Sequence, residues 1–262
     1  MIQYDAFPGG KQNAFTLSYD DGDLRDIRLM ALFREYGLKA TFHLVNHIFQ
    51  DATPAEIGAR YEGFEISVHG KYHHTLTILP PVSVTEEIMD NRKALEAAAR
   101  YPVTGMSYVC GGYNDAIIAQ LRTLGIVYAR TTVNTHKFGL PTDFMQWHPT
   151  CHHRDALTDG DAFLAGFDGY FSTPRLFYVW GHSHELRTEA DWDHMTRLCE
   201  KMAHNDRIWY ATNMELYRYL TAQRGLVTAA DESFVYNPTH TDVWIRKDGR
   251  PVCVRAGETQ FF

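Results

Sequence analysis

The sequence predicts an α/β fold, a parallel sheet with crossover helices, followed by a small antiparallel β appendix at the C-terminal end. Strand-like and helix-like segments alternate up to about residue 224, which is the pattern of a parallel sheet. After that point the segments become short and alternating, and Asp248-Gly249 separates two of them as in a tight hairpin. We therefore expect a main domain over residues 1–224, with residues 225–262 packed on it as the appendix.

Seven segments with a strand-like pattern are expected to form the main sheet. They are Ala14–Tyr19, Lys39–Val45, Phe64–Val68, Met106–Cys110, Val127–Thr131, Arg175–Trp180 and Ile208–Ala211. Helices are expected over Asp23–Tyr36, from about Ser83 to Arg100, and over Met214–Gln223. Ser83 with Glu86 forms a capping-box pattern, and Asn213 is placed to cap the last helix. Asn134–Thr158 has no such pattern and is expected to be a long loop, either functional or a plain surface insertion.

Composition excludes several classes of protein. The chain of 262 residues has a formal net charge of −7 and no basic run, which argues against a sequence-independent nucleic-acid binder. Its first residues lack the pattern of a secretory signal and no segment stays apolar long enough to span a bilayer, so a cytoplasmic protein without membrane contact is expected. The four cysteines are scattered without a C-x-x-C pair and are interpreted as reduced thiols.

Polar residues that could act in catalysis or metal binding follow three of the predicted strands. Asp20-Asp21-Gly22 ends the first strand, and two carboxylates at a turn can face one cavity, although either one could simply cap the next helix. His69 and His73 follow the third strand in H-x-x-x-H spacing, which together with an Asp gives a His₂Asp set with room for water. As an isolated pattern, H-x-x-x-H is more typical of loop histidines that are satisfied by hydrogen bonds. His69 and His74 also fit an H-x-x-x-x-H spacing.

The third group is His182 and His184, which follow the sixth predicted strand. A histidine at a strand end is well placed to exchange a proton near neutral pH, although it could also close the strand by hydrogen bonding. Strand ends meet at one rim of a barrel-like sheet, so the three groups are expected to lie together. Their joint occurrence favours a catalytic site.

In this order the segments resemble the polysaccharide deacetylase family of metal-dependent carbohydrate esterases. The matching motifs are Asp20-Asp21-Gly22, the strand Lys39-Ala40-Thr41-Phe42, and Glu65-Ile66-Ser67-Val68-His69 with His73. The resemblance implies an irregular, seven-stranded (β/α) barrel. It also implies Asp20 as catalytic base, Asp21, His69 and His73 as metal ligands, and His182, in preference to His184, as catalytic acid. The expected ion is zinc, with cobalt or nickel as alternatives.

The third family motif differs from the usual one. The family commonly has Arg-Pro-Pro-Tyr-Gly, whereas this chain has Tyr108-Val109-Cys110-Gly111-Gly112, so the arginine that orients the base is absent. Arg130, at another strand end, could replace it, although it could equally be a surface arginine. The backbone N–H of Cys110 corresponds to the family's oxyanion donor. Asp143 and Trp147 are loose candidates for a further aspartate and tryptophan motif.

The resemblance implies a hydrolase of non-peptide amide C–N bonds that removes the acetyl group from an N-acetylated sugar or a precursor of an oligo- or polysaccharide. One alternative is hydrolysis of another amide, such as a cyclic one, on the same scaffold. Another is a catalytically silent carbohydrate-binding relative, which the missing arginine suggests.

Overall fold

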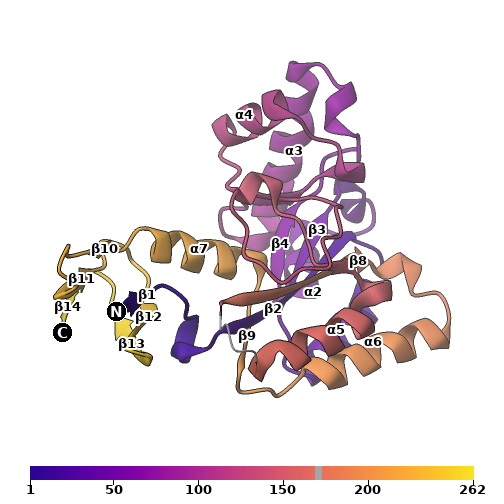
Figure 1. Ribbon diagram of the computed structural model, residues 1–262. Coiled ribbons are helices and arrows are strands. Elements are labelled where there is room, and N and C mark those ends of the chain that lie inside the picture. Colours follow the sequence, from indigo (N-terminus) through magenta and orange to yellow (C-terminus); the bar gives the residue numbers. More distant parts are fainter. Residues whose placement is uncertain (169–172) are drawn as a thin grey trace.

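The main domain of the computed structural model, which describes residues 1–168 and 173–262, is built on a curved sheet of parallel strands (Figure 1). The strands are β2 (Asn13–Asp21), β3 (Ala40–Leu44), β4 (Glu65–Val68), β5 (Gly105–Ser107), β6 (Tyr128–Arg130), β7 (Cys151–His152), β8 (Arg175–His182) and β9 (Ile208–Tyr210). Seven of them follow the path β6-β5-β4-β3-β2-β8-β7, and β9 pairs with the start of β2. Every predicted strand forms, and the seven strands of the path curl into a half-barrel, which confirms the predicted fold class.

The stretch Asn134–Thr158, expected to be irregular, contains β7, which was not predicted. Trp147 forms a parallel bridge with Arg130 of β6, and Cys151 pairs with Val179 of β8. This segment therefore joins the two sides of the half-barrel. A two-residue strand is too short to show the alternation on which a strand prediction depends.

Helices cover the sheet from both sides. They are α1 (Asp26–Glu35), α2 (Pro54–Arg60), α3 (Pro81–Ala99), α4 (Asp115–Thr123), α5 (Ala156–Ala165), α6 (Glu189–Met202) and α7 (Asn213–Arg224). In Figure 1, α3 and α4 rise above the sheet, while α5 and α6 lie side by side below it. Apolar side chains of β2, β3 and β4 pack beneath these helices, among them Tyr19, Phe42 and Ile66.

The start of α3 differs from the prediction. It begins at Pro81 after the N-cap Pro80, so Ser83 and Glu86 lie inside its first turns and form no capping box. Proline suits a first helical position because its missing N–H would have no intrahelical partner there.

The start of α7 differs as well. Its N-cap is Thr212, which forms a capping box with Glu215, while Asn213 is the first helical residue. The Asn213 side chain is buried instead: it accepts a hydrogen bond from Thr16 Oγ1 at 3.1 Å and donates one to Tyr178 Oη at 2.5 Å.

The C-terminal appendix consists of two small antiparallel sheets that also take in the N-terminus. Their strands are β1 (Ile2–Gln3), β12 (Val243–Lys247) and β13 (Arg250–Val254) in one sheet, and β10 (Val227–Thr228), β11 (Phe234–Tyr236) and β14 (Thr259–Phe261) in the other. The predicted hairpin turn is present, because Asp248 and Gly249 join β12 to β13 with φ values of 52° and 78°. Figure 1 shows both chain ends in this part, beside α7.

Within the described ranges, no helix combines the length and the apolar character that crossing a bilayer requires.

Candidate active site

Two carboxylates stand at the end of β2, where the backbone leaves the sheet. Asp20 is the last fully buried residue of the strand and is 2% exposed. Asp21 has a φ of 80° and Gly22 a φ of 87°, so the chain turns sharply at this point. A Cβ at position 22 would lie 2.6 Å from Ile48 Cγ2, which is why the motif needs glycine there. The turn aims Asp20 and Asp21 at different partners.

Asp21 faces two imidazole rings from the loop after β4. Its Oδ1 lies 3.4 Å from His69 Nε2 and 3.2 Å from His73 Nε2. The three ligand atoms all lie within 4.8 Å of one another. Asp21 Oδ1 is also buried, and no described residue hydrogen-bonds to it. A buried carboxylate oxygen without a donor, between two imidazole nitrogens, fits a divalent cation with an open position for water.

Ser107, at the end of β5, links Asp20 to His69. Its hydroxyl donates to Asp20 Oδ1 at 3.1 Å, so Ser107 Oγ is left to accept the proton on His69 Nδ1, 2.7 Å away. The Ser107 carbonyl oxygen lies 3.1 Å from the same nitrogen. With its proton on Nδ1, His69 presents a free lone pair on Nε2 toward Asp21. Such hydrogen bonds orient metal-binding histidines.

Arg130 reaches Asp20 from β6, although the usual motif arginine is missing. Its side chain is fully buried, donates from Nη2 to Asp20 Oδ2 and from Nη1 to the Thr131 carbonyl oxygen at 3.0 Å, and lies 4.5 Å above the Trp180 ring. Burial alone would raise the pKa of Asp20, but the charge of Arg130 holds this pKa below its usual range. Asp20 is therefore a carboxylate with a fixed orientation.

The two histidines after β8 face different groups. His182 is paired with Asp20 in the register of β8 and β2, and its Nδ1 lies 3.4 Å from Glu185 Oε2. His184 instead places Nδ1 3.5 Å from Asp21 Oδ2. Burial lowers the pKa of His182, but the nearby carboxylates of Glu185, Asp20 and Asp21 outweigh it and raise this pKa above its ordinary value. The carboxylates around His182 therefore favour its protonated form.

Three further candidates from the sequence are Cys110, Asp143 and Trp147. Cys110 has an exposed side chain and a φ of 53° in the 3₁₀ turn Val109–Gly111, after β5. Asp143 caps the turn Phe144–Gln146 and pairs with Arg122, while Trp147 packs between Tyr128 and Tyr178 in the second core cluster. The loose aspartate and tryptophan candidates are thus structural in their contacts.

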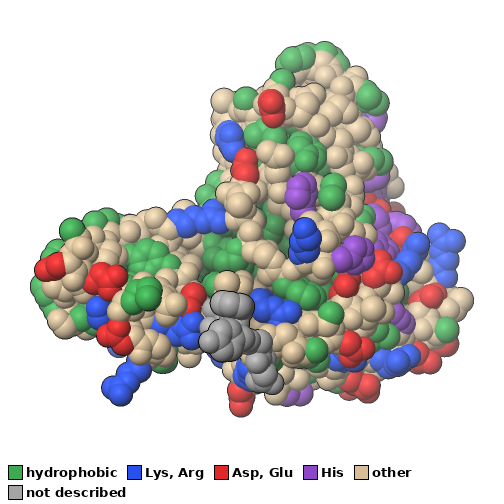
Figure 2. Space-filling model, viewed as in Figure 1, with side chains coloured by type: hydrophobic (Ala, Val, Ile, Leu, Met, Phe, Trp, Pro, Cys, Tyr) green, Lys and Arg blue, Asp and Glu red, His purple; other side chains and the backbone are tan. Residues whose placement is uncertain are grey.

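A pocket of about 290 Å³ is lined by two of the three metal-site residues, Asp21 and His73. Its lining residues are Asp21, Asp23, Val45, His47, His73 and His184. Figure 2 shows histidine side chains (purple) gathered beside acidic ones (red) on one side of the molecule. Three residues near the site were not predicted: His47, Ser107 and Glu185. Only the folded chain brings them close to the other site residues. The available signals were the position of Ser107 at a strand end and the spacing of Glu185 from His182.

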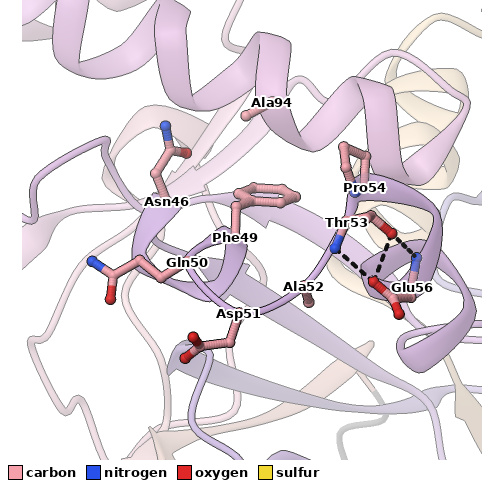
Figure 3. Close-up of a pocket in the computed structure, with 9 residues that line it drawn as sticks. All are labelled: Asn46, Phe49, Gln50, Asp51, Ala52, Thr53, Pro54, Glu56 and Ala94. Carbon is pink, nitrogen blue, oxygen red and sulfur yellow. Dashed lines mark hydrogen bonds between the residues drawn. The ribbon is translucent and has the colours of Figure 1, made fainter.

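A larger hollow of about 620 Å³ lies on the other side of the segment that carries His47. Figure 3 shows Asn46, Phe49 and Gln50 lining it, with Ala94 of α3 opposite. It contains none of the three metal-site residues. Asn46 connects it to the site, because its Oδ1 accepts a hydrogen bond from Asn91 at 2.7 Å, and Asn91 Oδ1 accepts one from the backbone N–H of His69 at 3.1 Å.

Comparison with known proteins shows a similarity to one family. The family profile "Polysaccharide deacetylase" matches residues 8–129, which include both aspartates and both metal-site histidines. A Mycobacterium smegmatis protein assigned as a polysaccharide deacetylase is similar in structure, with a TM-score of 0.65, 16% identity, and coverage of 84% of this chain and 93% of the other. A variant of the peptidoglycan deacetylase PdaC from Bacillus subtilis has a TM-score of 0.53 and 17% identity, over 81% and 93% of the two chains.

A Bacillus anthracis pseudoenzyme of carbohydrate esterase family 4 is also similar, with a TM-score of 0.52, 16% identity, and coverage of 82% and 68% of the two chains. No curated protein sequence matches the chain. At these identities the structural similarities establish the fold alone. The profile match shows the resemblance to the family over residues 8–129, which carry the aspartate and histidine motifs. The predicted resemblance to the polysaccharide deacetylase family is confirmed.

Proposed function

We propose that the chain is a metal-dependent N-deacetylase that hydrolyses the acetamido group of an N-acetylated sugar or of an oligo- or polysaccharide precursor. The observation that carries the proposal is the convergence of Asp21, His69 and His73 around one buried carboxylate oxygen that has no donor. Asp20 beside them is a fixed carboxylate. The relationship to deacetylases supplies the class of reaction.

Asp21, His69 and His73 would hold a divalent ion, preferably zinc, with cobalt or nickel as alternatives. Such an ion activates water and polarises the amide carbonyl. Asp20 accepts the proton of the attacking water, and its hydrogen bonds from Arg130 and Ser107 keep it aimed.

Two further groups complete the reaction. His182 donates a proton to the departing amine nitrogen, without which an amide C–N bond breaks poorly. The backbone N–H of Cys110 hydrogen-bonds to the developing oxyanion. Asp20 thus takes a proton from water, and His182 gives a proton to the amine.

A mass-spectrometric screen of N-acetylated sugars for loss of one acetyl group, run with and without a chelator, tests the proposal. We expect acetate release that stops when the metal is removed and returns when zinc, cobalt or nickel is added. His73→Ala serves as the metal-deficient control. Turnover of cyclic amides without acetate release would favour the other amide hydrolase, and sugar binding without turnover would favour the silent relative.

A further inference from the structure

A second group of side chains that can bind a metal lies beside the end of β8 and shares no residue with the first group. Its ligand atoms, which belong to His152, His182 and Glu185, all lie within 4.8 Å of one another. Glu185 Oε2 is 2.8 Å from His152 Nε2 and 3.4 Å from His182 Nδ1. A third imidazole, that of His153, approaches the same oxygen with its Nε2 at 3.4 Å. Imidazole nitrogens and a carboxylate oxygen are the donors that zinc prefers.

His182 Nδ1 shares an unusual feature with Asp21 Oδ1 of the first group. Both atoms are buried, and no described residue hydrogen-bonds to either of them. Glu185 Oε2 is close to His182 Nδ1, but the two atoms form no hydrogen bond. A buried polar atom without a partner costs free energy, and a cation between the nitrogen and the carboxylate would satisfy both.

The surrounding residues hold these ligands in place. Arg154 Nη2 donates to Glu185 Oε1 at 2.6 Å, so Oε2 is the oxygen that is left for an ion. The Trp180 ring lies 5.0 Å from the His152 ring and 5.6 Å from the His182 ring, measured between centroids. Contacts of this kind, from residues around the ligands, orient the ligands of a metal site.

Two features of Arg154 should make this group bind an ion more weakly than the first group does. Its backbone N–H donates to His152 Nδ1 at 3.4 Å, so an ion on Nε2 would move the ring proton to Nδ1 and cost this long hydrogen bond. Its guanidinium places a positive charge beside the carboxylate, although the side chain is largely exposed and water screens that charge. We therefore expect the group to fill only in added zinc, after the first group.

We propose that His152, His182 and Glu185 form a second zinc site, and that zinc bound there inhibits the enzyme by occupying Nδ1 of His182. The site is independent of the proposed function, whereas the inhibition rests on it. Zinc on Nδ1 displaces the proton of that nitrogen, which passes to solvent. His182 is then no longer an imidazolium and holds its Nε2 proton too firmly to give it to the departing amine. Without that proton the C–N bond breaks poorly.

Zinc binding by variants, measured without any sugar, tests the site. Equilibrium dialysis against zinc followed by elemental analysis should give two equivalents for the wild type, one tighter than the other. His152→Ala and Glu185→Gln should each lose the weaker equivalent and keep the tighter one, which also shows that the variants are folded. His73→Ala should lose only the tighter one. His136→Ala, at an exposed histidine that pairs with Asp159, is the matched control and should keep both.

The inhibition is measured as the rate of acetate release in excess zinc divided by the rate with one equivalent. We expect this ratio to fall about tenfold or more below one in the wild type, because the acid is lost, and to stay near one in His152→Ala. Equal inhibition of the two proteins would overturn the inhibitory role.

The site itself has its own contradicting outcomes. A wild type that binds a single equivalent, or a second equivalent that both His152→Ala and Glu185→Gln keep, would overturn it. A wild type that releases no acetate from any sugar would refute the proposed function and the inhibition with it. In that case a second equivalent that the two variants lose would still establish the zinc site.

Discussion

At the scale of single residues, Asp20 and Asp21 differ in their partners although they are neighbours in sequence. Asp20 accepts hydrogen bonds from Arg130 and Ser107, so both of its oxygens are satisfied by the protein. Asp21 Oδ1 lies beside two imidazole nitrogens, and no described residue hydrogen-bonds to it. These surroundings support the roles proposed above, proton transfer for Asp20 and metal binding for Asp21.

These two roles predict that a variant of Asp20 loses turnover alone, whereas variants of the metal-site histidines lose bound metal as well. Asp20→Asn should lower turnover by about a hundredfold or more while metal stays bound, because it removes the proton acceptor alone. His69→Ala or His73→Ala should lose both metal and turnover. Elemental analysis of each purified variant beside its rate of acetate release decides between these patterns, and an active Asp20→Asn enzyme would contradict the role of base.

Arg130 is expected to affect both stability and pH dependence. Arg130→Met leaves the buried Asp20 carboxylate without its cation, which should cost about 3 kcal/mol or more in the free energy of unfolding. The pKa of Asp20 should rise, so turnover should fall away at a higher pH on the acid side than in the wild type. Urea unfolding and a pH profile measure the two effects. Arg130→Lys should recover part of each, because lysine keeps the charge but loses the second N–H and the stacking on Trp180.

Asp26 should make the free energy of unfolding depend on pH, independently of the reaction. Burial raises its pKa to about 7, and the hydrogen bond that Tyr61 Oη donates to its Oδ2, at 2.7 Å, offsets only part of that rise. Because the folded-state pKa lies above the unfolded one, the stability that the protonated form contributes is complete below about pH 4 and is lost as pH rises through about 7.

Asp26→Asn stays neutral at every pH and still accepts the Tyr61 hydrogen bond. Its free energy of unfolding should resemble the wild type's near pH 4 and exceed it by up to about 4 kcal/mol near pH 8. Urea titrations of both proteins at the two pH values provide the measurement. An equal difference in the free energy of unfolding between the two proteins at both pH values would contradict the raised pKa of Asp26.

Part of the site could be foreseen from sequence because its residues follow strands in recognisable motifs. Asp20, Asp21, His69 and His73 belong to such motifs, and the fold brings them together. Arg130 could be named only as a candidate, because nothing local connects it with Asp20, 110 residues earlier in the chain. Contacts such as the one between Ser107 and His69 depend on strand order, which a sequence pattern does not contain.

At the scale of elements, seven strands of the main sheet and the helices α1, α3 and α7 were predicted. The helices α2, α4, α5 and α6 and the strand β7 were not. The hairpin at Asp248-Gly249 forms where its turn residues indicated. β7, with two residues, left no periodic signal. At the start of α7, Thr212 and Asn213 are both good N-cap residues, and tertiary packing decides between them: Asn213 is drawn into the core by Tyr178.

This arrangement predicts that replacing Thr212 and replacing Asn213 lower the free energy of unfolding by different amounts. Thr212→Ala should lower the free energy of unfolding by about 1 kcal/mol, the usual cost of a lost N-cap. Asn213→Ala should cost about 2 to 4 kcal/mol, because it leaves the buried hydroxyls of Thr16 and Tyr178 without a partner. Thr221→Ala, at an exposed position of the same helix, is the control. A larger cost for Thr212 than for Asn213 would contradict the observed start of α7.

At the scale of the whole molecule, the appendix connects the two ends of the chain. β1 pairs with β12, and Arg246 forms an ion pair with Asp5. Tyr219 of α7 accepts a hydrogen bond from the Trp244 N–H at 2.9 Å and donates one to the Ala6 carbonyl oxygen at 2.8 Å. The appendix is therefore bound to α7 and to the segment that leads into β2.

Deletion of residues 225–262 should consequently destabilise the main domain. The second core cluster would lose Val235, Val243, Ile245 and Val254, all fully buried, and would expose Phe7 and the apolar face of α7. Each lost aliphatic side chain corresponds to about 1.5 to 3 kcal/mol of burial, so the sum approaches the whole stability of an ordinary domain. We expect the shortened chain to aggregate or to melt well below the full chain in calorimetry. The milder Val243→Ala and Ile245→Ala variants should melt at intermediate temperatures, and a shortened chain that melts with the full one would show that the appendix is an independent unit.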